Sequence, residues 1–210
     1  MSELILRNRQ RARKIDFSLL GGIARTLLQE LLAVGDYELG VHLVAARAMA
    51  RHNRAYLRQD GSTDVITFDY RAIVGPASRL PECKPTETRG GRKTHPARPA
   101  PVRGLIRLEV PTLHGDIFIS VDDAVAHAHR YRTTWQEEIV RYLVHGILHL
   151  GGHDDMRPRA RRKMKRDENH LVRELALRFP LHKLSRRSSS HRRSSRRLTL
   201  FAVGKSIGTF

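Results

Sequence analysis

The sequence predicts an α+β fold, a single domain with one small mixed β-sheet and about five helices. Segments with helical hydrophobic periodicity outnumber the strand-like segments, and the strand-like segments are short. The chain has 210 residues. Roughly 150 of them would form the core, which is enough for one domain that buries about two thirds of its unfolded surface.

Strands are expected where apolar residues alternate, or where β-branched and aromatic residues gather. Leu39, Val41 and Leu43 alternate in this way. The four expected strands cover residues 3–9, 37–44, 63–70 and 115–120.

Helix starts are marked by side chains that can cap the first turn. The capping candidates are Asp16 or Ser18, Ser120 with Asp123, and Thr134 with Glu137. The five expected helices cover residues 16–33, 45–56, 121–130, 135–150 and 158–179.

Two segments are expected to lie outside this core, which we place within residues 1–180. Residues 71–104 hold six of the nine prolines and eight Lys or Arg, and a structureless segment of this length is uncommon inside a compact domain. We interpret it as a mobile basic insertion, which either contacts RNA or has no role. Residues 184–210 are rich in Ser and Arg and are predicted to form a disordered basic tail.

Two histidines of a strongly apolar segment, His145 and His149, are four residues apart. On a helix this spacing puts both side chains on one face, with Cβ atoms about 5–6 Å apart, so both imidazoles can reach one metal ion. Gly151-Gly152 then ends the helix, because glycine tolerates the left-handed backbone of a helix stop. The turn can bring a third ligand, Asp155 or His153, to the same ion. Three protein ligands and an open fourth position are typical of a catalytic zinc site.

A histidine pair at this spacing also occurs on polar helix faces and as a satisfied pair in a core. The apolar flanks favour the metal, because a largely buried imidazole needs a partner. Zinc peptidases of the H-E-x-x-H type carry their general-base Glu directly after the first His, and here that residue is Gly146. Glu138, two turns before His145, is either a surface carboxylate or a group that orients a ligand.

The segment from His145 to Asp155 resembles the signature of the YbeY endoribonucleases, the bacterial rRNA maturation factors, which reads H-G-x-L-H-L-x-G-Y-D-H. His153 stands in the place of the Tyr, and Asp155 stands in the place of the third His. The resemblance implies one zinc ion per chain, held by His145, His149 and Asp155. An aspartate oxygen shifts the metal preference toward Mn or Mg. The matching residues are His145, Gly146, Leu148, His149, Leu150, Gly152 and Asp154.

Two further blocks carry the resemblance, which covers roughly residues 3–175 apart from the insertion. Residues 53–68, N-R-A-Y-L-R-Q-D-G-S-T-D-V-I-T-F, follow the family's Asn-Arg-x-Tyr, Asp and Thr-Asp-Val-Leu-x-Phe. Residues 115–120, G-D-I-F-I-S, are similar to its Gly-Asp-Ile-x-Ile-Ser strand. In many members a catalytic arginine follows the Tyr directly, whereas here Leu57 holds that place and Arg58 comes next. The resemblance leads us to expect that Arg58 or Arg54 neutralises a phosphate oxygen.

The net positive charge of the chain is consistent with an RNA partner. The net charge is +18, from 39 Lys and Arg against 21 Asp and Glu. Residues 181–210 carry +8 of this, so +10 remains on residues 1–180. An excess of this size favours binding to polyanions. Aromatic residues make up only 6% of the chain, so binding is expected to depend on phosphate charge and RNA shape.

The resemblance implies a metal-dependent endoribonuclease that cuts single-stranded RNA. Its expected role is late maturation of rRNA, at the 16S 3′ end, and ribosome quality control. The expected partners are the small ribosomal subunit and its ribosomal or assembly-factor proteins. Two alternatives stay open, a non-catalytic ribosome-assembly factor with a structural metal and a zinc peptidase-like hydrolase. The single cysteine, Cys83, and the lack of a signal peptide or membrane span favour the cytoplasm.

Overall fold

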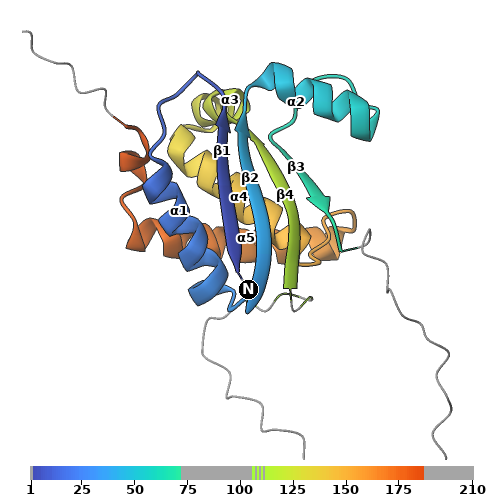
Figure 1. Cartoon of the computed structure of the whole chain (residues 1–210), viewed down its shortest axis with the longest axis vertical. Helices are drawn as coiled ribbons and strands as arrows, with labels where there is room; N and C mark the ends of the chain where they lie inside the picture. The colour runs from blue at the N-terminus through green and yellow to red at the C-terminus, as the bar shows by residue number, and fades with distance from the viewer. Residues whose placement is uncertain (1, 72–105, 107, 109, 111, 187–210) are drawn as a thin grey trace, which may run out of the picture.

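A four-stranded mixed sheet forms the centre of the protein, whose computed structural model describes residues 2–71, 106, 108, 110 and 112–186. The strand order is β1-β2-β4-β3 (Figure 1). β1 and β2 are parallel, as are β2 and β4, whereas β3 runs antiparallel to β4. The strands are β1 (Glu3–Arg9), β2 (Asp36–Val44), β3 (Val65–Asp69) and β4 (Thr112–Ser120).

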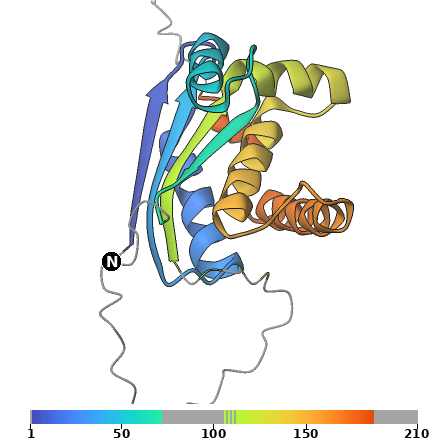
Figure 2. The same ribbon diagram turned by 90° about the vertical axis from the view of Figure 1, so that its right-hand side faces the viewer.

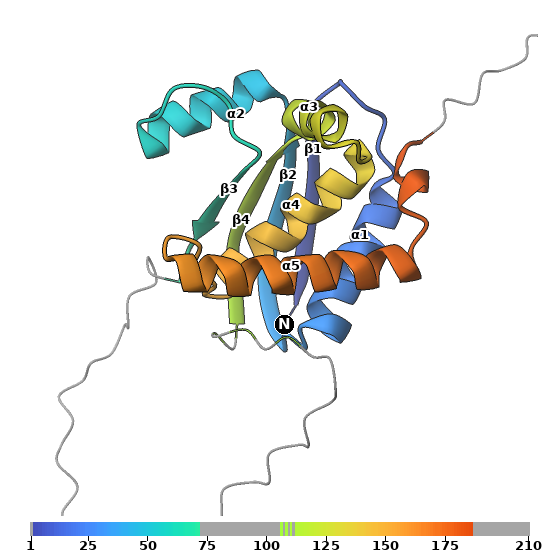
Figure 3. The same ribbon diagram turned by 180° about the vertical axis from the view of Figure 1, so that it is seen from behind.

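Five α-helices of the described residues accompany this sheet, and the α+β fold is as predicted. Helices α1, α4 and α5 all lie on one face of the sheet (Figure 2). Seen from behind, α5 crosses over α4 as the outermost element (Figure 3). The helices are α1 (Phe17–Thr26), α2 (Ala46–His52), α3 (Val121–Tyr131), α4 (Trp135–Leu150) and α5 (Pro158–Arg178).

The alternation of the strands explains which face the helices cover. Leu39, Val41 and Leu43 of β2 point to the helical side and are buried, together with Ile117 and Ile119 of β4. Burying an aliphatic side chain of this kind stabilises the fold by about 1.5–3 kcal/mol. On the other face, Met49 of α2 packs in a smaller cluster with Val44, Ile66 and Phe118.

Helix α4 is held against the sheet on its apolar side. Ile139, Leu143 and Ile147 are completely buried. Gly146 makes the close approach possible, because a Cβ at this position would lie 2.7 Å from Cγ2 of Ile117. The C-terminal half of α4 is therefore fixed close to β3 and β4.

The predicted helix starts are confirmed. Asp16 accepts a hydrogen bond from the Leu19 amide at 3.0 Å. Ser120 caps α3 through the Asp123 amide, and Thr134 caps α4 through the Glu137 amide. The three side chains satisfy amides that have no partner inside their helices.

Several predicted boundaries were wrong. Helix α1 ends at Thr26 and continues as a π-helical turn, Leu27–Leu31, rather than as α-helix to Ala33. Helix α2 ends at His52 and also continues as a π-helical turn, Asn53–Leu57. Strand β4 begins at Thr112, earlier than expected, because it pairs with β2 along its whole length. Sequence patterns do not contain this tertiary pairing.

The basic tail begins later than residue 184, where we had placed its start. A 3-10 turn, Leu181–Leu184, follows α5, and Leu184 is completely buried. Ser185 forms a bridge with Ile15. Most of the expected insertion, residues 72–104, and of the tail, residues 187–210, lies outside the described residues.

Within the described ranges, no helix is both long enough and apolar enough to cross a membrane.

Candidate metal centre

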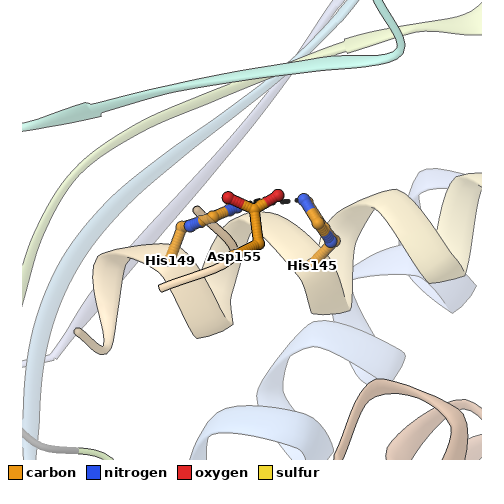
Figure 4. Close-up of side chains that lie close together, drawn as sticks. All are labelled: His145, His149 and Asp155. Atoms are coloured by element: carbon orange, nitrogen blue, oxygen red, sulfur yellow. Dashed lines mark hydrogen bonds and ion pairs between the residues drawn. The ribbon is translucent and has the colours of Figure 1, made fainter. Parts of the chain in front are cut away.

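The C-terminal half of α4 presents its two histidines toward one point. Nε2 of His145 and Nε2 of His149 lie 3.0 Å apart (Figure 4). Both imidazoles are partly buried, with 26% and 27% of their side chains exposed. The helical spacing predicted from the sequence therefore brings both nitrogens within reach of one ion.

Asp155 reaches the same point from the loop that follows α4. Gly152 allows the chain to reverse because it adopts a φ of +92°. The Arg161 guanidinium then donates a 2.8 Å hydrogen bond to the backbone carbonyl of Asp155, which fixes the loop to α5. Asp155 Oδ2 lies 4.0 Å from His149 Nε2. The ligand atoms of His145, His149 and Asp155 all lie within 4.8 Å of one another.

The hydrogen bonds on the far sides of the rings define the tautomers. Nδ1 of His145 lies 3.1 Å from Glu168 Oε2, and Nδ1 of His149 lies 3.1 Å from the carbonyl oxygen of His153. Because a carboxylate and a carbonyl only accept hydrogen bonds, each Nδ1 donates, and each neutral imidazole then has its lone pair on Nε2. Burial lowers the pKa of His149, and the neighbouring His145 lowers it further, so the neutral form is favoured although Asp155 acts in the opposite direction.

The donor set fits a divalent cation. The lone pairs on Nε2 of His145 and Nε2 of His149 repel each other, because the two nitrogen atoms lie only 3.0 Å apart. A cation bound by both nitrogens would remove this repulsion. Two imidazole nitrogens and one carboxylate oxygen are ordinary zinc ligands, and three protein ligands leave a position open. His145, His149 and Asp155 therefore suit a single metal ion.

The side chain of His153 lies elsewhere. It is 5% exposed, and its Nε2 lies 3.2 Å from Asp167 Oδ2. Of the two third ligands that the sequence allowed, the structure groups Asp155 with the histidine pair. His153 contributes its backbone carbonyl to the site, through the bond that orients His149.

Glu168 of α5 is a residue of this site that the sequence analysis missed. It is 3% exposed, and its carboxylate accepts hydrogen bonds from His145 at 3.1 Å, Arg141 at 2.8 Å and Lys165 at 2.8 Å. Burial raises its pKa, but the hydrogen bonds from these three residues outweigh burial and bring the pKa of Glu168 to about 2. An ionised carboxylate behind a histidine ligand fixes the ring and makes it more basic.

Glu138, the carboxylate that the sequence suggested, has a different environment. It is 5% exposed, so the expectation of a surface residue was wrong. Its carboxylate accepts a 2.5 Å hydrogen bond from Thr133 Oγ1 and lies 3.9 Å from Arg141 Nε. These partners do not include either histidine of the pair.

A hollow of about 350 Å³ opens in front of the three candidate ligands, and Leu57 stands on its rim. The segment from Thr63 to Thr67 forms its other wall. Arg54 pairs with Asp60 at 3.0 Å and lines a separate hollow beside Ala50. Arg58 is exposed at the end of the π-helical turn, with a left-handed φ of 54°. Neither Arg54 nor Arg58 lines the hollow in front of the candidate metal ligands, which we call the metal-side hollow. The phosphate-binding role expected of these two arginines stays a prediction.

The sequence model of the family described as Endoribonuclease YbeY matches residues 5–176. The chain belongs to the YbeY endoribonuclease family. It is 36% identical over 160 residues to the Endoribonuclease YbeY of Myxococcus xanthus, which covers 76% of this chain and 44% of that protein. The Anaeromyxobacter protein of the same name is 32% identical, with 68% and 58% covered. The Chlorobium luteolum protein is 27% identical, with 78% and 91% covered.

This YbeY-family chain therefore spans about half the length of the Myxococcus and Anaeromyxobacter relatives. Among solved structures, the solution structure of TM1509 from Thermotoga maritima resembles it with a TM-score of 0.53. The sequence identity is 19%, and the alignment covers 90% of this chain and all of TM1509. That likeness supports the fold.

Proposed function

We propose that this chain is a metal-dependent endoribonuclease that cuts single-stranded RNA. The observation that carries the proposal is the convergence of His145 Nε2 and His149 Nε2 at 3.0 Å, with Asp155 beside them, in a member of the YbeY family. We propose zinc as the ion, one per chain, because its ligand preferences match two imidazoles and one carboxylate.

The proposed substrate is ribosomal RNA, cut during late maturation at the 16S 3′ end and during ribosome quality control. The proposed partners are the small ribosomal subunit and its ribosomal or assembly-factor proteins, in the cytoplasm. The net charge of +18 supports a polyanionic partner.

A second basic feature supports RNA binding close to the metal centre. A run of cations begins two residues after Asp155, at the N-cap of α5, and continues through the first half of this helix. All seven are exposed: Arg157, Arg159, Arg161, Arg162, Lys163, Lys165 and Arg166. Arginine suits phosphate because its planar guanidinium donates two parallel hydrogen bonds. This basic run is the phosphate-binding surface that we propose.

His145, His149 and Asp155 would hold the metal ion in the proposed mechanism. When bound, the ion supplies a nucleophile at neutral pH and stabilises negative charge that develops on the phosphate. Glu168 keeps the His145 ring in the orientation that exposes its Nε2 lone pair. Arg54, within the π-helical turn, or Arg58, directly after it, would neutralise a phosphate oxygen.

The test compares RNA cleavage by the wild type and by His149→Ala, with and without a chelator. Cleavage by the wild type should require metal, and His149→Ala should bind RNA with wild-type affinity yet leave it intact. Wild-type cleavage that persists in excess chelator would refute metal dependence. Metal analysis of both proteins shows whether the variant has lost its ion.

The same variant separates the alternatives. A non-catalytic assembly factor predicts equal ribosome maturation in cells that carry wild type or His149→Ala. A peptidase-like hydrolase predicts that the purified protein degrades casein and leaves RNA uncut.

A further inference from the structure

A second hollow, of about 470 Å³, lies directly beside the metal centre. His145 and Asp64 line both this hollow and the one that contains the candidate metal ligands. An RNA chain with a phosphate at the metal centre therefore has its neighbouring nucleotide within reach of the second hollow. Its volume falls in the range of about 300–1,000 Å³ that small-molecule sites occupy.

One wall of this hollow is aromatic. Tyr131, the last residue of α3, is 60% exposed, and its ring stands nearly perpendicular to the His127 ring, with 5.8 Å between centroids. A 2.6 Å hydrogen bond to the Tyr142 hydroxyl holds the imidazole of His127. The Arg130 guanidinium lies 5.4 Å from the Tyr131 centroid. The Tyr131 ring faces an open hollow and is held from behind by His127 and Arg130. Such a ring is suited to stack against another planar group.

The opposite side is polar and carries charges of both signs. Lys165 stands at the rim with 59% of its side chain exposed, and Arg141 lies deeper, bonded to Asn169. Asp64 and the buried Glu138 add carboxylates to the lining. These carboxylates would repel a second phosphate, whereas a neutral base with polar edges meets both donors and acceptors. The charge pattern favours a nucleobase over a phosphate.

We propose that this hollow, the Tyr131 hollow, binds one unpaired nucleobase of the substrate, next to the bond that is cut. The base stacks on the Tyr131 ring while its phosphate lies at the metal centre. The inference rests on the proposed function, because RNA is the substrate proposed above. A base in a duplex is already paired and stacked, so it would have to leave the helix before it could enter. The Tyr131 hollow thus gives a physical reason for a preference for single strands.

The experiment measures how zinc-loaded wild type, Tyr131→Ala and Tyr131→Phe bind a short single-stranded RNA that contains 2-aminopurine, whose fluorescence falls when it stacks. Tyr131→Ala should bind about 5- to 100-fold more weakly, as expected for the loss of one base stack, and should not quench the probe. Tyr131→Phe keeps the ring and should bind and quench like the wild type. Because the zinc-loaded protein is expected to cut the probe, the three titrations are repeated in the His149→Ala background, which should bind RNA and leave it intact, and gel analysis checks the RNA after each titration.

Two further readings separate stacking from other causes. The dependence of affinity on salt should be unchanged in Tyr131→Ala, because the variant keeps every cation that binds phosphate, whereas Lys165→Gln should lower it. Affinity for duplex RNA should be the same in the wild type, Tyr131→Ala and Tyr131→Phe. Wild-type affinity and quenching in Tyr131→Ala would overturn the inference even if the protein cuts RNA. A protein that cuts no RNA, but loses affinity and quenching in Tyr131→Ala, would refute the proposed function and leave the base-binding hollow standing.

Discussion

Replacing Glu168 by alanine should weaken zinc binding by roughly 10- to 100-fold, the usual effect of removing a carboxylate that orients a metal-bound histidine. The structure explains why the effect should be this large. The Glu168 carboxylate accepts the hydrogen bond from His145 Nδ1, and it is buried, so water cannot easily replace it. Without it, the His145 ring is free to turn its Nε2 lone pair away from the site.

The same substitution should lower the free energy of unfolding of the metal-free protein by about 1.5–3 kcal/mol, the contribution of one hydrogen bond to a charged group. Arg141 loses its 2.8 Å bond to Glu168 but keeps Asn169 at 2.8 Å. Lys165 is 59% exposed and contributes little, because water replaces the exposed ion pair. The destabilisation should therefore stay below the cost of leaving a buried charge without any partner.

The assay for zinc is competition with a chromophoric chelator, and the assay for stability is urea unfolding in excess chelator, which removes the contribution of bound metal. Glu174→Ala is the matched control, since Glu174 lies on the same helix but pairs at 3.7 Å with Arg178, away from the histidines. The control should retain wild-type zinc affinity. If Glu168→Ala binds zinc within twofold of wild type, packing alone orients His145 and our account of Glu168 is wrong.

Three further outcomes follow from the site and from the chain ends. Purified protein should contain about one zinc ion per chain, and the double variant His145→Ala, His149→Ala should contain none by elemental analysis. Asp155→Ala should lose more metal than His153→Ala, and Asp155→His should retain the metal. If only His153→Ala loses metal, Asp155 is not the third ligand. Deleting residues 187–210 should lower the log–log salt slope of RNA affinity by about 0.7–0.9 for each phosphate that the tail neutralises, without changing zinc content. An unchanged slope would remove the tail from the RNA-binding surface.

Much of this fold could be predicted because its signals are local in sequence. A capping side chain and the amide that it accepts from are three residues apart, as for Asp16 and Leu19. The spacing of His145 and His149 follows from helical geometry, and the structure bears it out. These features depend on a few neighbouring residues, so tertiary packing has little opportunity to override them.

The parts that could not be predicted depend on contacts between distant segments. Glu168 is 23 residues beyond His145 in the sequence, and only the packing of α5 on α4 brings the two together. The position of Leu57 at the metal-side hollow depends on a π-helical turn for which hydrophobic periodicity gives no signal. The burial of Leu184 likewise depends on the bridge between Ser185 and Ile15.

The close approach of Gly146 to the sheet limits the chemistry to which this scaffold can evolve. Hydrolases that carry a glutamate after their first histidine need room for its carboxylate in front of the metal. Here a side chain at position 146 would start 2.7 Å from Ile117 and 3.3 Å from Thr67, so it would push α4 away from the sheet that orients the site. The H-G-x-x-H segment of this chain and the H-E-x-x-H motif differ at one position. In this fold, replacing Gly146 by Glu alone would not produce a working H-E-x-x-H site.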